Sequence, residues 1–390
     1  MPRRLKSRRM VRDTIKRIVF HIVYPFCYRL GCLKTVKKKK AVFVQTHGER
    51  LSDNFELLYQ SLQQRGYETL LFCLRVSDSG WIRIIARSIR LLFAMADAGV
   101  ILVDESNSLM GSFRLRRNSR MIQLWHACGA FKKWGFSVAD KSFGDDEKNL
   151  KAYSGHGNYS LVTVSGQEVC WAYEEAFGLE PGGGIVRPVG VSRTDVFFDE
   201  KKRAAAVAKL HTFIPEAEGR KVIVYLPTFR GDIAGAKAPE GFDIGRLKEL
   251  EQEYMILIRN HPFVKEAVRI PAECAGFVRE IRDGMSVEEL IMTADLMITD
   301  YSSVVFEYSL MNRPMIFYAY DMEQYDLERG FYYPYREFVP GRIAVTMEEL
   351  IQAIREADNY DYDKLAAFRS RYMSGCDGHA TERITEFIEQ

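Results

Sequence analysis

Several signals that identify common enzyme classes are missing from this 390-residue sequence. It contains no GxxxxGK(S/T) nucleotide-binding loop, no GxSxG nucleophile turn and no HExxH metal-binding helix. Its seven cysteines are scattered and include no CxxC pair, which predicts reduced thiols and no zinc or redox site. We therefore expect no tightly bound cofactor and no metal site. Dependence on a divalent metal ion stays open.

Acidic residues are nearly absent from the first 40 residues, which hold fourteen Lys and Arg and only one acid, Asp13. This segment carries a charge of +13, so the other 350 residues carry −10 within the net charge of +3. A basic tail on an acidic body indicates a tether to an anionic membrane surface. A basic body would have indicated nucleic acid, which we do not expect as a partner.

A long hydrophobic run is also missing. The apolar core of the basic segment, 18–28, is shorter than the ~20 residues that span a bilayer, and no small-residue cleavage site follows it. On a helix, one face gathers the apolar side chains of Ile15, Ile18, Val19, Ile22 and Val23. This pattern predicts an amphipathic helix in the headgroup plane. A solvated basic tail, or one that packs on a partner protein, is the alternative.

From residue 41 onward, short apolar runs alternate with amphipathic stretches of helix length, which is typical of parallel-sheet α/β proteins. The alternation breaks in a polar stretch at 211–220 and restarts at 221–226. We predict two doubly wound domains, in which ligands bind at the carboxyl ends of strands. The predicted boundaries are a membrane-association segment at 1–40, domains at 41–215 and 216–375, and a C-terminal tail at 376–390.

The sharpest candidate site follows the predicted strand 295–299. Thr299 and Asp300 end this strand, and Ser302 and Ser303 are expected to open a helix. A helix start offers unpaired backbone N–H groups and the positive end of the helix dipole, so the pattern predicts a diphosphate site. An ordinary serine N-cap is the alternative.

A second candidate, His126, comes directly after the predicted strand 121–125. Its near-neutral pKa suits it to take a proton from an attacking hydroxyl, and Lys132 and Lys133 add positive charge nearby. His47 has a similar position in a weaker setting. A surface or structural histidine is the alternative reading of each.

Two more strand ends, at 226–230 and 258–262, carry Arg230 and His261. Phosphoryl transfer depends on charge stabilisation and positioning more than on covalent chemistry, and arginine suits multidentate phosphate contact. Surface ion pairing is the alternative, but it becomes less attractive when three strand ends converge.

Taken in order, these motifs resemble the CDP-glycerol glycerophosphotransferase family of wall teichoic acid synthesis over roughly residues 41–375. The motifs that carry the resemblance are Ile298-Thr-Asp-Tyr-Ser-Ser-Val-Val-Phe-Glu-Tyr, Arg313-Pro-Met-Ile-Phe-Tyr-Ala-Tyr-Asp321, Tyr325, Arg329-Gly-Phe-Tyr332, Pro340-Gly341, Leu124-Trp-His126, Tyr225-Leu-Pro-Thr-Phe-Arg230, Arg259-Asn-His-Pro262 and Gly48-Glu-Arg-Leu-Ser-Asp-Asn54.

The resemblance implies a GT-B fold of two Rossmann-like domains facing a cleft, with CDP-glycerol bound by the second domain. It implies transfer of glycerol phosphate to a hydroxyl of an undecaprenyl-diphosphate-linked saccharide or polymer, with release of CMP. It also implies a peripheral enzyme on the cytoplasmic face of the cell membrane.

Carried over by position, His126 matches the family's proposed general base and His261 its second essential histidine. Donor contacts fall on Arg230, Thr299, Asp300, Ser302 and Ser303, with Asp321 and Tyr325 bordering the polyol. Asn54, Lys132 and Lys133 are placed on the acceptor side.

The chain departs from the family pattern in the loop 127–133 and in the turn 190–195, which lacks a proline. Both departures affect the expected acceptor more than the chemistry. The alternatives are a CDP-ribitol-dependent enzyme, a nucleotide-sugar glycosyltransferase or epimerase of the same fold, and a catalytically silent membrane adaptor.

Overall fold

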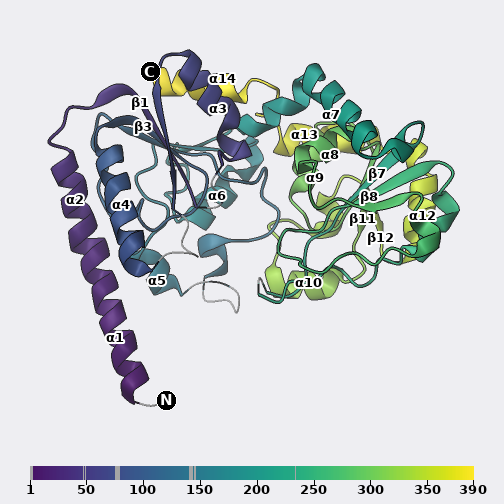
Figure 1. Ribbon diagram of the computed structural model, residues 1–390, viewed down its shortest axis with the longest axis horizontal. Helices are drawn as coiled ribbons and strands as arrows, with labels where there is room; N and C mark the ends of the chain where they lie inside the picture. The colour runs from purple at the N-terminus through teal and green to yellow at the C-terminus, as the bar shows by residue number, and fades with distance from the viewer. Residues whose placement is uncertain are drawn as a thin grey trace. The chain divides into compact units, whose positions relative to one another are not determined.

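The structure is a computed structural model that describes residues 3–46, 48, 50–74, 80–139, 144, 146–232 and 234–390, with the side chains of 3–9 and 11 excepted. It divides into two compact units, each built on a six-stranded parallel sheet (Figure 1). Unit 1 comprises Met1–His126, Trp134–Arg193 and His379–Gln390, and unit 2 comprises Ala127–Lys133 and Thr194–Gly378. The predicted α/β construction from two Rossmann-like domains is confirmed.

The sheet of unit 1 has the strand order β2-β1-β3-β4-β5-β6. Its strands are β1 (Lys37–Gln45), β2 (Glu68–Cys73), β3 (Ala98–Val103), β4 (Arg120–Gln123), β5 (Leu161–Thr163) and β6 (Val186–Arg187). The first strand of the sheet is β1. The chain then adds β2 on one side of β1, and β3 to β6 follow in order on the opposite side of β1. This reversal places a topological switch point between β1 and β3, where doubly wound sheets bind ligands.

The other helices of unit 1 are α3 (Asp53–Gln64), α4 (Trp81–Ala96), α5 (Glu147–Ala152), α6 (Cys170–Phe177) and α14 (Ala380–Glu389). Apolar side chains of the sheet and of α3 and α14 form one core cluster, which includes Phe43, Leu102, Phe55 and Ile384. Strands buried on both faces are continuously apolar, which is why they were visible in the sequence.

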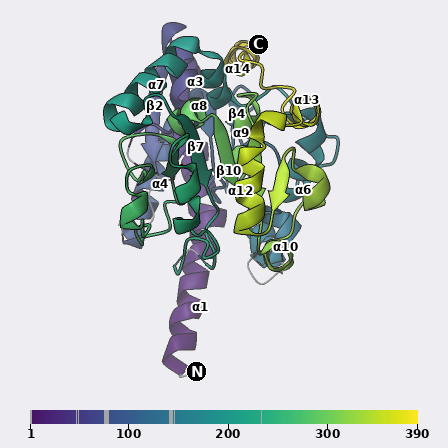
Figure 2. The ribbon, with the colours of Figure 1, turned by 90° about the vertical axis from the view of Figure 1, so that its right-hand side faces the viewer.

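The N-terminal segment forms α1 (Arg3–Ile18), a π-helical turn (Val19–Val23) and α2 (Tyr24–Gly31). Gly31 lets α2 approach α4 closely, because a Cβ at Gly31 would lie 2.6 Å from the Cβ of Ala96. Tyr28 stacks on Phe113 with ring centroids 4.1 Å apart. In both views α1 projects beyond the other elements of unit 1 (Figures 1 and 2).

The predicted boundary at residue 40 falls inside β1, where Lys40 is buried and paired with Asp97. The lysine run 37–40 therefore belongs to β1, which lies between β2 and β3 in the sheet. Among the described helices, none is long and apolar enough to cross a membrane.

The sheet of unit 2 has the strand order β12-β11-β10-β7-β8-β9, with its switch point between β7 and β10. Its strands are β7 (Lys221–Leu226), β8 (Tyr254–Ile258), β9 (Val278–Glu280), β10 (Leu296–Thr299), β11 (Met315–Tyr318) and β12 (Arg342–Ala344). Its helices are α7 (Glu200–Phe213), α8 (Val287–Thr293), α9 (Val304–Ser309), α10 (Met322–Arg329), α11 (Tyr335–Phe338), α12 (Met347–Arg355) and α13 (Tyr362–Tyr372).

Unit 2 begins at Thr194 and not at residue 216, so α7 belongs to unit 2. The compact units differ from the predicted domain boundaries in two further places. The predicted tail 376–390 contains α14, which packs on α3 in unit 1 through buried Ile384 and an ion pair of Arg65 with Glu389 at 2.6 Å. The segment Ala127–Lys133 belongs to unit 2, because the Phe131 ring stacks on Phe331 and Phe338 there. Neither assignment can be read from hydrophobic periodicity, which does not reveal which sheet a segment joins.

Candidate functional site

Functional side chains gather at one edge of the unit 2 sheet. The adjacent strands β11, β10, β7 and β8 are followed by Asp321, Asp300, Arg230 and His261 respectively. Because the strands are parallel, their carboxyl ends lie at the same edge. The structure therefore brings together side chains that lie up to 91 residues apart in the sequence.

Asp300 ends β10 as a buried carboxylate, only 1% exposed. Its Oδ1 accepts hydrogen bonds from the backbone N–H of Thr228 at 2.8 Å, the Thr228 hydroxyl at 2.5 Å and the N–H of Tyr301 at 2.6 Å. Thr299 is also buried, and its hydroxyl donates to the carbonyl of Leu226. These bonds tie the loop after β7 to the loop after β10, so both residues shape the switch point from within.

Arg230 is held by two carboxylates. Its Nε and Nη2 donate to Asp321 at 2.5 and 3.0 Å, while its Nη1 lies 3.0 Å from Asp300 Oδ2 and donates to the carbonyl of Thr228 at 2.8 Å. Burial would lower the pKa of Arg230, but the hydrogen bond to Asp321 and the two negative charges outweigh burial and raise it. The rings of Tyr301 and Tyr325 each lie 5.1 Å from the guanidinium.

Ser302 and Ser303 lie before α9, which begins at Val304 and is only six residues long. The predicted helix thus starts one to two residues later than expected. Ser302 Oγ accepts from Val304 N at 3.4 Å, whereas Ser303 makes no side-chain cap. Within the described part of the chain, no hydrogen bond engages the backbone N–H of Ser302 or Ser303, so both donors remain for a ligand.

His261 follows β8 in a turn where its Nδ1 accepts the N–H of Phe263 at 3.3 Å. A backbone N–H can only donate, so the neutral ring carries its proton on Nε2. Burial and the charge of Lys132 lower the pKa of His261, which favours this neutral form. The ring packs against Phe229 and Phe263, which also contact each other. Its Nε2–H is therefore a hydrogen-bond donor.

The two lysines that follow His126, Lys132 and Lys133, make different contacts in the structure. Lys132 bridges Phe331 through the backbone and donates from Nζ to the hydroxyl of Tyr325 at 3.4 Å. Lys133 N donates to the carbonyl of Gly330, and its ammonium lies 6.0 Å from the ring of Tyr332. Both lysines lie in unit 2, whereas His126 lies in unit 1, and their place on the acceptor side stays a prediction.

In unit 1, His126 follows β4 and its Nδ1 lies 3.1 Å from the backbone carbonyl of Asp104, which follows β3. A carbonyl only accepts, so Nδ1 carries the proton and Nε2 keeps its lone pair. Trp125 lies in the left-handed region with φ 56°, and its ring contacts the His126 ring in a tilted arrangement with centroids 4.2 Å apart. Such backbone strain in a bulky residue is often found at functional sites.

Asp104 was not singled out from the sequence, yet it stands at the switch point of unit 1. Its buried carboxyl accepts from Ser52 Oγ at 2.9 Å and from Asn54 Nδ2 at 3.4 Å. Burial, aided by the charge of Glu105, raises the pKa of Asp104 to about 6. The available signal was an acid directly after the apolar run 99–103. The predicted residue Asn54 thus lies beside a titrating carboxyl.

The structure places His126 and Asn54 in unit 1 and the other predicted residues in unit 2. His47 lies outside the described residues. Among the residues that are described, no group of three or more His, Cys, Asp or Glu side chains is arranged to hold a metal ion.

These features identify the structural class of the protein. It is an α/β protein of two Rossmann-like units with polar side chains at both switch points. Residues 26–390 match the model of the family described as CDP-Glycerol:Poly(glycerophosphate) glycerophosphotransferase. The chain therefore belongs to this family, and it is an enzyme of the teichoic acid phosphotransferases, as the resemblance implied.

Curated relatives agree with this assignment. The chain is 34% identical to the teichoic acid ribitol-phosphate primase of Bacillus spizizenii over 94% of its own length and 95% of the relative's. It is also 34% identical to the teichoic acid poly(ribitol-phosphate) polymerase of that organism, of which it spans only 58%. The teichoic acid glycerol-phosphate primase of Bacillus subtilis is 28% identical over 77% of the chain and 76% of the relative.

Solved structures resemble the fold. The wall teichoic acid polymerase TagF has a TM-score of 0.76 over 99% of this chain and 97% of the solved one, at 23% identity. A variant of TagF has been solved after a soak with CDPG. A UDP-GlcNAc 2-epimerase from Methanocaldococcus jannaschii has a TM-score of 0.55 over 90% of this chain and 99% of the solved one, at 13% identity.

Proposed function

We propose that the protein transfers a polyol phosphate from a CDP-activated polyol to a hydroxyl of a membrane lipid-linked acceptor, in the synthesis of teichoic acid or a related cell-surface polymer. The observation that carries the proposal is the set of strand ends at the unit 2 switch point. There Arg230, Asp300 and Asp321 form a rigid frame beside the backbone donors of Ser302 and Ser303. Backbone N–H groups at such a position are suited to a diphosphate.

In the proposed reaction, the acceptor hydroxyl attacks the β-phosphorus of the CDP-polyol. A new P–O bond forms, the bond from that phosphorus to the bridging oxygen breaks, and CMP leaves. His126 Nε2 takes the hydroxyl proton, since the Asp104 carbonyl holds the other ring proton on Nδ1. His261 Nε2–H and the Ser302–Ser303 amides donate to the phosphate oxygens as charge develops.

We infer CDP-glycerol or CDP-ribitol as the donor. The predicted glycerol donor is supported by the family description and by the glycerol-phosphate primase relative. Ribitol is supported by the names of the relatives at 34% identity. The two polyols differ in length, so the residues beyond Asp321 and Tyr325 would distinguish them.

The function is tested by incubating the full chain with each CDP-polyol and a lipid-linked disaccharide or an oligomeric primer, then measuring CMP release and product mass. UDP- and GDP-sugars serve as competing donors. CMP release with either polyol supports the proposal. Turnover of a nucleotide sugar alone would replace it with the glycosyltransferase or epimerase alternative, and the absence of all turnover and donor binding would favour the silent adaptor.

His126→Ala provides the sharper test of mechanism. We expect turnover to fall by ~100- to 10,000-fold, the usual contribution of general-base catalysis, with the affinity for the CDP-polyol retained. Near-wild-type turnover would show that another group removes the proton.

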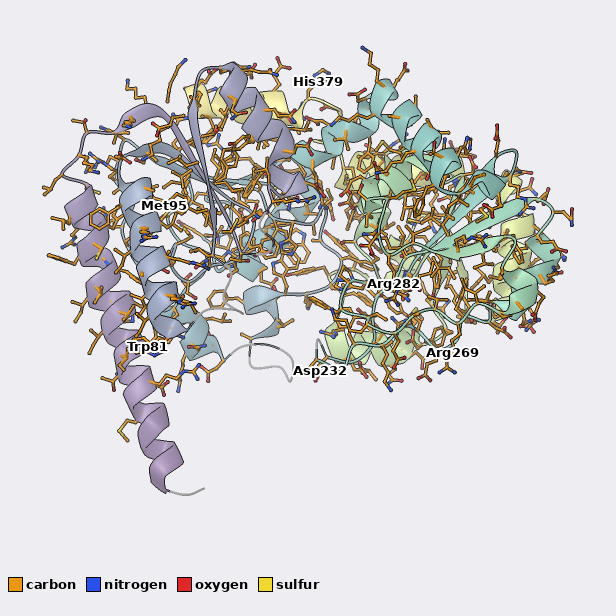
Figure 3. All side chains as sticks on the ribbon, in the orientation of Figure 1. Trp81, Met95, Asp232, Arg269, Arg282 and His379 are labelled. Atoms are coloured by element: carbon orange, nitrogen blue, oxygen red, sulfur yellow. The ribbon has the colours of Figure 1, made fainter. Side chains whose placement is uncertain are left out.

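We further propose that the N-terminal helices attach the enzyme to the cytoplasmic membrane surface. Along α1, the π-helical turn and α2, one exposed stripe is formed by Ile15, Ile18, Ile22, Phe26, Leu30 and Leu33. Ile22 and Phe26 are 62% and 65% exposed, so they are available to lipid. The opposite face, with Tyr24 and Tyr28, is buried. Trp81 at the start of α4 is also exposed (Figure 3). An apolar stripe with nearby basic residues is typical of a helix lying in the headgroup plane.

Vesicle co-sedimentation tests this attachment. The variant carrying Ile22→Asp and Phe26→Asp should bind phosphatidylglycerol vesicles more than ~10-fold more weakly, because two apolar side chains no longer insert. Leu327→Asp, which changes an equally apolar side chain that is 88% exposed on α10, is the matched control. Equal binding by all three proteins would exclude the stripe as the attachment surface.

A further inference from the structure

Lys132 is a cation near the unit 2 switch point that the proposed reaction does not use. It lies on the segment Ala127–Lys133, which pairs with unit 2 through the backbone bridge of Lys132 with Phe331. The neighbouring hydrogen bond from Tyr332 N to the carbonyl of Phe131 fixes this segment in place. The backbone of Lys132 is therefore anchored, and its side chain is presented in a defined position.

Arg230, the cation expected to hold the donor phosphates, is already committed. It makes a two-point contact with Asp321, pairs with Asp300 and donates to the Thr228 carbonyl. A guanidinium has five N–H donors, and the carboxylates and the carbonyl use most of them. Together Arg230, Asp300 and Asp321 carry a net charge of −1, which would repel a diphosphate. Donor binding therefore requires a further cation at these strand ends.

Lys132 meets this requirement. Its Nζ has no acidic side chain within ion-pair distance among the described residues, and its one hydrogen bond, to Tyr325, is long at 3.4 Å. Its surroundings are dry enough to lower the pKa of Lys132 to about 8, an effect strengthened by Arg329 and Arg230 and opposed by Asp300. A desolvated ammonium without an anion is costly, so a bound anion would stabilise it strongly.

The contacts of Tyr325 connect Lys132 to the strand ends. Lys132 Nζ donates to the hydroxyl of Tyr325, and the ring of Tyr325 stacks on Tyr301, which follows β10, at 4.0 Å between centroids. His261 follows β8 and presents its Nε2–H as a donor, and the charge of Lys132 is one of the two causes that lower the pKa of His261. A diphosphate, with several acceptor oxygens and two or more negative charges, fits this pair of groups.

We propose that Lys132 is the cation that binds the diphosphate of the CDP-activated donor, while Arg230 holds the loops that form the site. This inference rests on the proposed function. It moves Lys132 from the acceptor side to the donor side. Arg230 becomes a positioning residue, because its guanidinium acts through Asp300 and Asp321.

The test measures the dissociation constant for CDP-glycerol and for CDP-ribitol by calorimetry, using the full chain and its Lys132→Met variant. Loss of a charge-assisted contact should weaken donor binding by about 10- to 100-fold. Lys364→Met is the matched control, since it removes one exposed lysine charge from α13 in the same unit and should leave affinity unchanged. Thermal melting of each variant verifies that it is folded.

The pH dependence separates donor binding from simple charge balance within the site. Because the pKa of Lys132 is lowered to about 8, its positive charge is present below that pH and lost above it. The groups that face it are Arg230, Asp300, Tyr325, Arg329 and His261. Donor affinity of the wild type should fall as pH rises through about 8, whereas Lys132→Met should lose this fall.

The outcomes are distinguishable. A folded Lys132→Met variant with wild-type donor affinity, or with an unchanged fall in affinity at alkaline pH, would overturn the assignment of Lys132. A variant whose melting temperature drops while affinity holds would show that Lys132 only balances the charge of Asp300 and Asp321. Failure of the wild type to bind either CDP-polyol would instead reject the proposed function.

Discussion

Asp104 offers a direct test of the electrostatics at the unit 1 switch point. Replacing Asp104 with Asn keeps the shape of the side chain and an oxygen that accepts from Ser52 and Asn54, but removes the ability to ionise. It also leaves the backbone carbonyl that holds His126 in place. The substitution therefore isolates the energetic cost of a buried charge.

The magnitude follows from the pKa of the carboxyl. Burial raises the pKa of Asp104 from 3.8 to about 6, and one pKa unit corresponds to ~1.4 kcal/mol, so ionisation costs the folded state about 3 kcal/mol at neutral pH. Because the folded pKa is the higher one, the wild type has its full stability from this group below the unfolded pKa and loses it as pH rises through about 6. Roughly 1 kcal/mol of this loss falls between about pH 5 and about pH 7.5.

Denaturant unfolding at several pH values measures this effect. The stability of Asp104→Asn relative to the wild type should increase by about 1 kcal/mol over that pH interval. Asp363→Asn removes an exposed carboxyl from α13 and should show the pH dependence of the wild type. A stability difference between Asp104→Asn and the wild type that stays constant with pH would refute the raised pKa and the argument built on it.

Three other predictions concern both units. Gly129→Ala should destabilise unit 2 by at least ~2 kcal/mol in denaturant unfolding, because Gly129 has φ +61° and an added Cβ would lie 2.1 Å from the buried Phe306 ring. Asp321→Asn should cost about 1 to 3 kcal/mol of unfolding free energy and also weaken donor binding in calorimetry, since it removes the charge of a two-point ion pair while Arg230 keeps its pairing with Asp300. In the neutral imidazole rings, NMR of the ring nitrogens should find the proton on Nδ1 of His126 and on Nε2 of His261. The same tautomer in both histidines would contradict the proposed division of roles.

The parallel sheets and the strand-end positions could be predicted from the sequence because each depends on local pattern. A strand buried on both faces is continuously apolar, so the apolar runs at 41–46, 221–226 and 295–299 could be predicted to be strands. Residues that follow such a run lie at the carboxyl edge of a parallel sheet, where ligands bind. His126, Arg230 and His261 could therefore be predicted as site residues.

What the sequence did not reveal depends on contacts between distant residues. The sequence does not show that Asp321, 91 residues later, pairs with the guanidinium of Arg230, the predicted phosphate ligand. Asp104 was not singled out because its raised pKa results from burial in the folded chain, which the sequence does not show. Lys132 is close to His126 in the sequence, although its backbone forms a bridge with Phe331 and it belongs to unit 2.

The two histidines show how the backbone sets chemical role. Both follow parallel strands, and from sequence both are neutral rings near a strand end. A carbonyl faces Nδ1 of His126, which leaves Nε2 able to accept a proton, whereas an N–H faces Nδ1 of His261, which makes Nε2 a donor. Proton removal from a hydroxyl needs the first arrangement, and stabilising a charged phosphate oxygen needs the second. One hydrogen bond in each unit therefore supports the roles proposed for the two histidines.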